Sequence, residues 1–354
     1  MVSKRMIILA CLLTTVMPWQ GIDAQVRGGV AREEGAVKPR VVVLATGGTI
    51  ASRAGSSTQV SGYSIGFTGD QLLEMIPGVE DIAEVTVEQF SNIASGSMTV
   101  ERWISMSNRI TELLEGPDDY DGVVVTHGTD TLDETAFFLH LTVKSFKPVV
   151  CTGAMRPSSS VSADGPMNLY NSIRLAAEPA AHGMGVMVML NDEINSAREV
   201  YKSDTHRVET FQSGALGFLG WVDSDGVVFY RKPLRRHTAD SEFNISDRQD
   251  LPRVDIVYTY IGVDEYAVKG FVEAGAKGLI IEGVGAGGTP SSFRAASRSI
   301  RDAGIVTVSG SRTPDGRVTG GVDTLPGHKA RILLMLALTL TDDPGEIRRI
   351  FAEY

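Results

Sequence analysis

The sequence predicts an α/β protein with a larger N-terminal domain, whose mainly parallel sheet is flanked by helices, and a smaller C-terminal α/β domain. The chain has 354 residues, enough for two domains of ordinary size. Apolar, β-branched runs alternate with segments of helical period, which indicates a parallel sheet covered by helices on both faces. A charged stretch at residues 235–250 interrupts this alternation, and we interpret it as a linker between domains at 39–234 and 251–354.

The N-terminal domain opens with residues 41–45, a continuous apolar run typical of a strand that is buried on both faces. Residues 53–66 are rich in Gly and Ser and have no clear period, so we expect a mobile loop that could act as a lid. The alternation then continues to residue 190. We expect helices at 71–76, 100–115, 131–143 and 168–178, and strands at 122–126, 148–152 and 185–190.

The same alternation returns after the linker. Residues 332–338 are apolar all round but far too few to cross a bilayer, so we expect them in a helix of the core. For the rest of the C-terminal domain we expect strands at 254–258, 278–282 and 306–309, and helices at 266–274, 291–303 and 329–339.

Residues 1–24 have the pattern of a secretory signal peptide. Two basic residues precede an apolar run at residues 6–17, and Ala24 offers a small residue for cleavage. A membrane anchor is the alternative, but the run is too short to span a bilayer, and Cys11 lies too near the basic residues for a good lipoprotein site. We therefore expect a periplasmic or secreted protein with no stable membrane anchor, and a flexible leader at residues 25–38.

Composition and spacing exclude several classes of function. The net charge of −10 argues against a nucleic-acid partner, because binding to the phosphate backbone needs clustered Lys and Arg; we interpret the acidity as a source of solubility. None of the six His stands at ligand spacing from another, so we expect no metal site. Removal of the signal peptide leaves Cys151 as the one cysteine, which allows no intrachain disulfide and fits a small buried hydrophobe.

Two segments share one form, in which an apolar strand ends in a Gly-rich turn that holds Thr. The first turn is Thr-Gly-Gly-Thr at 46–49, and the second is Thr-His-Gly-Thr-Asp-Thr at 126–131. Ligands of open α/β sheets bind beyond the carboxyl ends of the strands, so we expect both turns at one crevice, where glycines let main-chain N–H groups approach a ligand. Either turn alone is more readily structural than catalytic. A phosphate cradle is the other alternative, but a Walker loop needs a Lys that this sequence lacks.

Five motifs carry a resemblance to a known family. They are Ala45-Thr-Gly-Gly-Thr-Ile-Ala51, Thr126-His-Gly-Thr-Asp-Thr131, Gly153-Ala-Met-Arg-Pro157, Ser162-Ala-Asp-Gly-Pro166 and Lys329-Ala-Arg331. From about Arg40 to Tyr354 the chain resembles the bacterial type II, periplasmic L-asparaginases, including the asparaginase–glutaminases. The resemblance implies hydrolysis of L-asparagine to L-aspartate and ammonia through a threonine nucleophile and a covalent acyl-enzyme. It also implies a homotetramer with sites between paired subunits, and neither metal nor cofactor.

The resemblance also implies roles for single residues. Thr49 matches the nucleophile, and Tyr63 matches the Tyr that helps to activate it. Thr129 matches the second catalytic Thr, and Lys202 matches the Lys that pairs with it. Asp130 matches the residue that binds the substrate amine, and Ser95 matches the residue that binds its carboxylate. Main-chain N–H groups at Gly48 and Gly128 would stabilise the oxyanion of acyl transfer.

Each of these assignments has a structural alternative. Lys202 could be a solvated loop residue, Tyr63 a mobile surface residue, and Asp130 the N-cap of the helix that follows it. We interpret His127 as a structural residue at a strand end and Arg156 as the anchor of a loop or an interface.

Several positions depart from the family pattern. After its carboxylate-binding Ser the family commonly has Gln or Glu, which helps to hold the substrate amine. This chain has Gly96 at that position, and we count Gly96 among the candidate substrate-binding residues. Residues 259–262 read Thr-Tyr-Ile-Gly instead of Asn-Tyr-Ala-Asn, and the segment 312–328 is short, with Asp315 and Asp323 as its only acids. These changes leave the substrate open. The alternatives are an amidase for L-glutamine or another small ω-amide, and a catalytically weak amino-acid-binding homologue.

Overall fold

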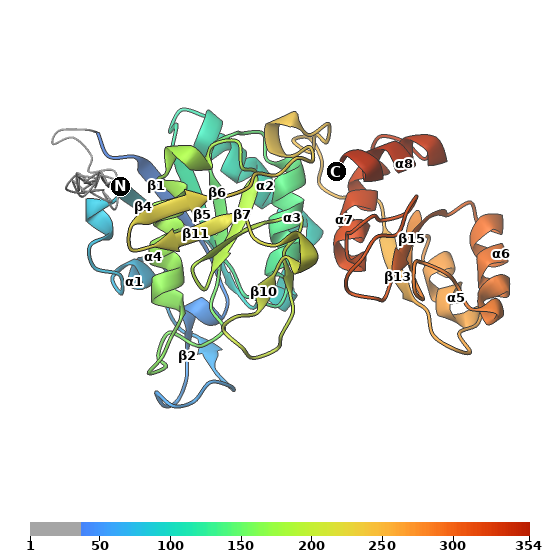
Figure 1. Ribbon diagram of the computed structural model, residues 1–354, viewed down its shortest axis with the longest axis horizontal. Coiled ribbons are helices and arrows are strands. Elements are labelled where there is room, and N and C mark those ends of the chain that lie inside the picture. Colours follow the sequence, from blue (N-terminus) through green and yellow to red (C-terminus); the bar gives the residue numbers. More distant parts are fainter. Residues whose placement is uncertain (1–36) are drawn as a thin grey trace, which may run out of the picture.

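The computed structural model describes residues 37–354 (Figure 1). The predicted signal peptide and almost all of the predicted leader lie outside these residues. The larger body contains an eight-stranded sheet of order β12-β11-β8-β7-β6-β5-β1-β4, in which β7, β6, β5, β1 and β4 run parallel. A second, three-stranded parallel sheet of order β13-β14-β15 forms the smaller body at the right of Figure 1. The predicted fold class is confirmed.

Both faces of the large sheet are buried, which explains the continuous apolar run at its centre. Val42 and Leu44 of β1 join a core cluster with α2 and α3, whereas Val41 and Val43 join a second cluster with α4. The strands are β1 (Arg40–Gly47), β4 (Glu84–Ile93), β5 (Gly122–Thr126), β6 (Val149–Thr152), β7 (Val186–Leu190), β8 (Glu193–Ser196), β11 (Gly220–Asp223) and β12 (Gly226–Phe229). The helices are α1 (Gly69–Leu73), α2 (Val100–Glu115), α3 (Leu132–Thr142) and α4 (Gly165–Ala176).

The smaller body packs α5 and α6 on one face of its sheet and α7 on the other, where α7 also contacts α3. The apolar residues of α7 are buried, as expected for a core helix. The elements are β13 (Val254–Tyr258), α5 (Tyr266–Glu273), β14 (Gly278–Gly283), α6 (Arg294–Asp302), β15 (Val306–Ser311), α7 (Gly327–Ala337) and α8 (Pro344–Glu353).

Short elements complete the described chain. Two strand pairs stand apart from the sheets: β2 (Ser52–Arg53) with β3 (Ser64–Ile65), and β9 (Tyr201–Lys202) with β10 (Phe211–Gln212). One-turn 3-10 helices lie at Thr49–Ala51, Val79–Asp81, Ser95–Ser97, Pro179–Ala181, Gly214–Leu216, Thr238–Asp240 and Ser291–Phe293. No helix within residues 37–354 is long and apolar enough to cross a membrane.

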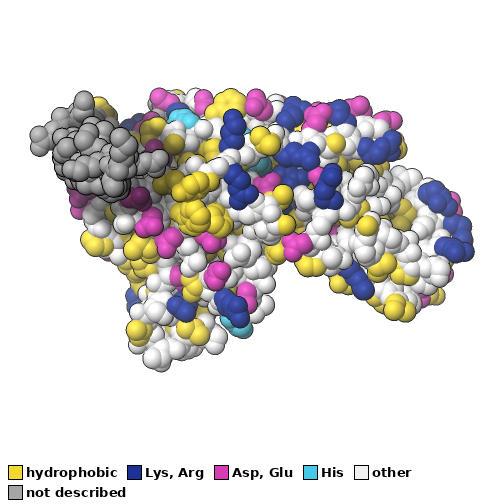
Figure 2. Space-filling view, in the orientation of Figure 1, with side chains coloured by type: hydrophobic (Ala, Val, Ile, Leu, Met, Phe, Trp, Pro, Cys, Tyr) yellow, Lys and Arg dark blue, Asp and Glu magenta, His cyan; other side chains and the backbone are white. Residues whose placement is uncertain are grey.

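The connection between the two bodies is packed against the end of the chain. Phe243 is fully buried, and its ring lies 4.9 Å from that of Tyr354, which follows α8. Arg236 pairs with Glu353 of α8 at 2.7 Å. The charges that mark residues 235–250 as a linker in the sequence therefore bind this segment to α8. Figure 2 shows acidic and basic side chains mixed along the upper edge of the molecule, where α8 lies in Figure 1.

Two local expectations are modified. Helix α1 begins at Gly69 instead of 71, because Thr68 and Gln71 form a reciprocal capping box that starts the helix early. Residues 53–66 include the short β2–β3 pair, so the Gly-rich segment has fixed ends and an exposed tip. Cys151 is buried as expected, and burial raises the pKa of its thiol to about 12.

Candidate active site

The two Thr-containing turns meet at the carboxyl ends of neighbouring parallel strands. Ala45 of β1 stands opposite Thr126 of β5, so the turns that follow leave the same edge of the sheet. A Cβ atom on Gly48 would lie 2.3 Å from the Cα of Gly128, and Gly48 has a φ of +82°. Only glycine allows this approach, and the two turns meet at one edge of the sheet.

A third turn joins them from β4, on the other side of β1. Ser95 follows β4 and is 6% exposed, and its carbonyl accepts a hydrogen bond from Thr131 Oγ1 at 3.0 Å. A Cβ on Gly128 would lie 2.9 Å from Ser95 Oγ. The Ser95 hydroxyl thus lies against the contact between the Gly-rich turns, where a ligand's polar groups could be bound.

Thr49 and Tyr63 are in contact. The Thr49 Oγ1 and Tyr63 hydroxyl oxygens lie 3.0 Å apart. Tyr63 directly precedes β3 in the segment that projects from the lower side of the larger body in Figure 1, and it is 37% exposed. The contact places a second hydroxyl beside Thr49 that can exchange a proton with it.

Thr129, Asp130 and Lys202 form a second group. The Lys202 ammonium donates to Thr129 Oγ1 at 3.0 Å and to Asp130 Oδ1 at 2.7 Å. Thr129 is 4% exposed, whereas the Asp130 side chain is 80% exposed and keeps its other oxygen open to solvent. Lys202 is therefore bound to the turn and is not a solvated loop residue. Asp130 makes no side-chain cap to α3.

Two known protein families match this chain, and together they cover nearly all of residues 37–354. Residues 40–235 match the family "Asparaginase, N-terminal", and residues 253–351 match "Glutaminase/Asparaginase C-terminal domain". The chain belongs to the asparaginase family. It is an amidohydrolase, since family and named relatives agree on that chemistry.

Two curated relatives and one solved structure illustrate the similarity. "L-asparaginase 2" of Bacillus subtilis strain 168 is 44% identical over 327 residues, which cover 89% of this chain and 87% of that protein. "Probable L-asparaginase periplasmic" of Haemophilus influenzae is 38% identical over 339 residues, which cover 92% of this chain and 96% of that protein. The crystal structure of the probable cytoplasmic L-asparaginase from Campylobacter jejuni aligns with a TM-score of 0.86 and 40% identity, covering 90% of this chain and all of that one.

Two further residues of this asparaginase behave as the sequence indicates. His127 is 1% exposed, and its ring nitrogens contact Gly128 O at 2.7 Å and Thr135 Oγ1 at 3.0 Å. Burial lowers the pKa of the His127 imidazole, which keeps it neutral and structural. Arg156 binds the carbonyl and hydroxyl of Ser162, both at 3.0 Å, and so anchors a loop.

Sequence reasoning missed Asp133. This residue of α3 is 5% exposed, and its Oδ2 lies 3.4 Å from the main-chain N of Lys202 and 3.2 Å from Nε2 of His328. The available signal was an acid three positions after Asp130 in a helix that begins at the active-site turn. Its partners lie 69 and 195 residues away, so no local pattern indicates them.

Two of the departures from the family pattern can be described from their surroundings in the structure. Gly96 is exposed, and a Cβ built on it would meet no atom within 4 Å, so the position is open. Asp323 pairs with Arg235 at 2.7 Å and with Arg317 at 2.5 Å, so it is engaged within its own chain. The described residues hold no group of three or more His, Cys, Asp or Glu that could bind a metal ion.

Proposed function

We propose that this asparaginase is an exported enzyme that hydrolyses the side-chain amide of L-asparagine, with Thr49 as nucleophile. The observation that carries the proposal is the pair of contacts at one sheet edge, Thr49 with Tyr63 and Thr129 with Lys202. A threonine hydroxyl is a weak nucleophile unless a neighbour assists the loss of its proton. Tyr63 is such a neighbour for Thr49, and the Lys202 ammonium fixes the Thr129 hydroxyl by donating to it.

Acylation would begin when Thr49 Oγ1 attacks the carbonyl carbon of the amide. The new C–O bond forms as the hydroxyl proton passes through Tyr63 towards the amide nitrogen. The C–N bond then breaks, ammonia leaves, and an ester links Thr49 to the aspartyl group. Main-chain N–H groups of the turns around Gly48 and Gly128 would bind the oxyanion.

Deacylation needs a water molecule, and Thr129 with Lys202 would serve this step. The Lys202 ammonium fixes the Thr129 hydroxyl, which can orient the water and return a proton to Thr49 as the ester C–O bond breaks. L-aspartate then leaves. Each cycle consumes one amide and one water and yields one carboxylic acid and one ammonia.

A second candidate substrate class is supported by the open space around Gly96. No side chain at this position contributes to a bound ammonium group, which leaves Asp130 as the acid of these turns that can bind it. We therefore keep L-glutamine and amine-free ω-amides as alternative substrates for the same chemistry.

Export and a homotetramer are part of the proposal. Export is supported by the signal-like pattern of residues 1–24 and by the name of the Haemophilus influenzae relative, which calls it periplasmic, whereas the Campylobacter jejuni relative is named as cytoplasmic. Association is supported by exposed apolar side chains of the smaller body: Tyr258, Tyr260, Ile261 and Tyr266 are 52–94% exposed. Fractionation of cells and light scattering on the purified protein test these two points.

The direct experiment is ammonia release from L-asparagine, L-glutamine and succinamic acid by the purified protein. We expect turnover of at least one amide, and most of it lost in Thr49→Val. No ammonia from any amide would favour an amino-acid-binding homologue.

A further inference from the structure

One carboxylate connects the active-site turn with the C-terminal domain. Asp133 Oδ2 lies within reach of the main-chain N–H of Lys202 and of Nε2 of His328. Lys202 in turn donates its ammonium hydrogen to Thr129. A chain of contacts therefore runs from His328, through Asp133 and the main chain of Lys202, to the Thr129 hydroxyl.

His328 stands at the start of α7, where this helix packs on α3. The next residue, Lys329, is fully buried, and its ammonium donates to the carbonyls of Ala197 and Val200. The first turn of α7 thus binds the segment that leads into Lys202 at two places: Lys329 binds its carbonyls, and His328 reaches the Lys202 main chain through Asp133.

The ionised state of Asp133 fixes the direction of its hydrogen bond with His328. Burial alone would raise the pKa of Asp133, but the hydrogen bond and charge of His328 and the charge of Lys329 hold it below its ordinary value. The Asp133 carboxylate is therefore ionised and offers no proton. Nε2 of His328 must carry the hydrogen and donate it, which makes the contact charge-assisted.

We propose that His328 is a positioning residue for the hydrolysis: it fixes Asp133, and through Asp133 the main chain of Lys202, so that the Lys202 ammonium stays at Thr129. The proposal rests on the roles of Thr129 and Lys202 in the proposed function. It assigns to the C-terminal domain a part in the site of its own chain.

Charged groups of α3, β14 and α7, together with Arg312, lie near His328. Glu282, at the end of β14, is 7% exposed, and its Oε1 has no hydrogen-bond partner among the described residues. A Cβ on Gly327 would lie 2.3 Å from that oxygen, so the carboxyl lies against the residue before His328. Glu282, His328 and Arg312 line one cavity of about 240 Å³. The charged groups near His328 are Asp133 and Glu134 of α3, Glu282 of β14, Lys329 and Arg331 of α7, and Arg312.

The test compares His328→Ala, which removes the hydrogen-bond donor to Asp133, with His328→Gln, which keeps a donor at this position. Displacing a catalytic group by about 1 Å can cost about 10²-fold in rate. We expect His328→Ala to lower kcat for L-asparagine about 10- to 100-fold with KM within about threefold, and His328→Gln to restore kcat to within about threefold of wild type.

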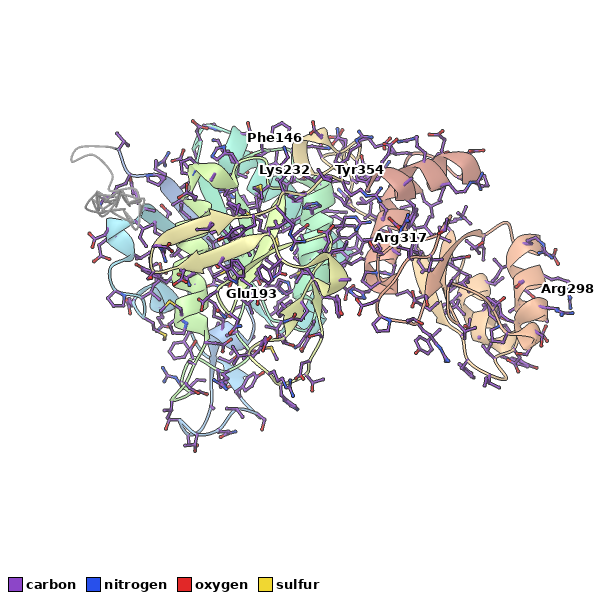
Figure 3. The ribbon with its side chains drawn as sticks, in the orientation of Figure 1. Phe146, Glu193, Lys232, Arg298, Arg317 and Tyr354 are labelled. Carbon is purple, nitrogen blue, oxygen red and sulfur yellow. The ribbon has the colours of Figure 1, made fainter. Side chains whose placement is uncertain are left out.

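Two matched controls are available. His182→Ala removes an exposed histidine, and Arg298→Ala removes an exposed charge on α6, at the far end of the smaller body in Figure 3. Both should keep wild-type kcat. A folded His328→Ala protein with kcat within about twofold of wild type would overturn the proposal, as would a loss of melting temperature without a loss of kcat.

A failure of this proposal can be told apart from a failure of the proposed function. If Thr129→Val and Lys202→Met keep wild-type kcat, the roles that the proposed function gives to Thr129 and Lys202 are wrong. If both lose activity while His328→Ala does not, only the role of His328 is wrong. Should His328→Ala not fold, His328→Leu, which keeps a bulky side chain but donates no hydrogen bond, replaces it and is combined with Asp133→Asn in a double-mutant cycle on kcat. Non-additive losses support the proposal, and additive losses overturn it.

Discussion

Replacing Glu282 by Gln should change the dependence of stability on pH. Burial raises the pKa of the Glu282 carboxyl to about 7, and the nearby charge of His328 opposes this shift. The folded protein therefore binds this proton more tightly than the unfolded chain does, where a Glu carboxyl has its ordinary pKa of about 4.5. The stability from this group is complete below about pH 4.5 and is lost as the pH rises through about 7.

The size of the effect follows from these two values. Each pKa unit corresponds to about 1.4 kcal/mol, so ionisation of Glu282 lowers the stability by about 3 kcal/mol well above pH 7, and by under about 1 kcal/mol at pH 5. Gln has nearly the same shape and cannot ionise. We therefore expect the free energy of unfolding of Glu282→Gln, relative to that of wild type, to rise by about 2–3 kcal/mol from pH 5 to pH 8.5.

Thermal unfolding of both proteins at equal concentration, at pH 5 and pH 8.5, measures this difference. The comparison between the two pH values cancels any constant effect of burying an amide. Glu101→Gln, at an exposed position in the first turn of α2, is the control and should give no such difference. If Glu282→Gln differs from wild type in stability by the same amount at both pH values, burial does not raise the pKa of the Glu282 carboxyl and the reasoning is refuted.

Three further predictions concern the active site. Thr49→Val and Thr129→Val should each lose most turnover while folding normally; a variant that keeps more than roughly a tenth of wild-type kcat, under about 1.4 kcal/mol in the barrier, has the wrong role assigned to it. Residues 53–66 should gain hydrogen-exchange protection with saturating L-aspartate, since closure would bring Tyr63 over a ligand; equal protection in both states contradicts this lid. Gly96→Gln should increase the preference for L-asparagine over succinamic acid, because a hydrogen bond to an ammonium is worth about 1.5–3 kcal/mol; an unchanged kcat/KM ratio means that position 96 does not face the amine.

The strands that lie inside the large sheet could be predicted from the sequence, and its edges could not. β1 and β5 are covered on both faces and read as continuous apolar runs. β4 forms one edge of the sheet, and its alternation of exposed and half-buried residues gives no apolar run. At the other edge, β11 and β12 have four residues each and join through a turn at residues 224–225, and each strand is too short to show a clear period.

The candidate site shows the same limit. The meeting of the Gly48 and Gly128 turns could be predicted, because parallel neighbours end at one edge and both turns carry glycines. The partnership of Lys202 with Thr129 joins positions 73 apart, and it came from the family resemblance alone. The contact of Asp133 with His328 joins two domains, and neither the local pattern nor the resemblance indicates it.

The covalent intermediate tests the central claim most directly. The protein would be mixed with L-asparagine, quenched in acid within the first turnovers, digested, and analysed by mass spectrometry. The account predicts that the peptide containing Thr49 gains the mass of asparagine less ammonia, in wild type and more strongly in Thr129→Val, where deacylation is impaired. An adduct on Thr129 or another residue, or ammonia release by Thr49→Val at the wild-type rate, would contradict it.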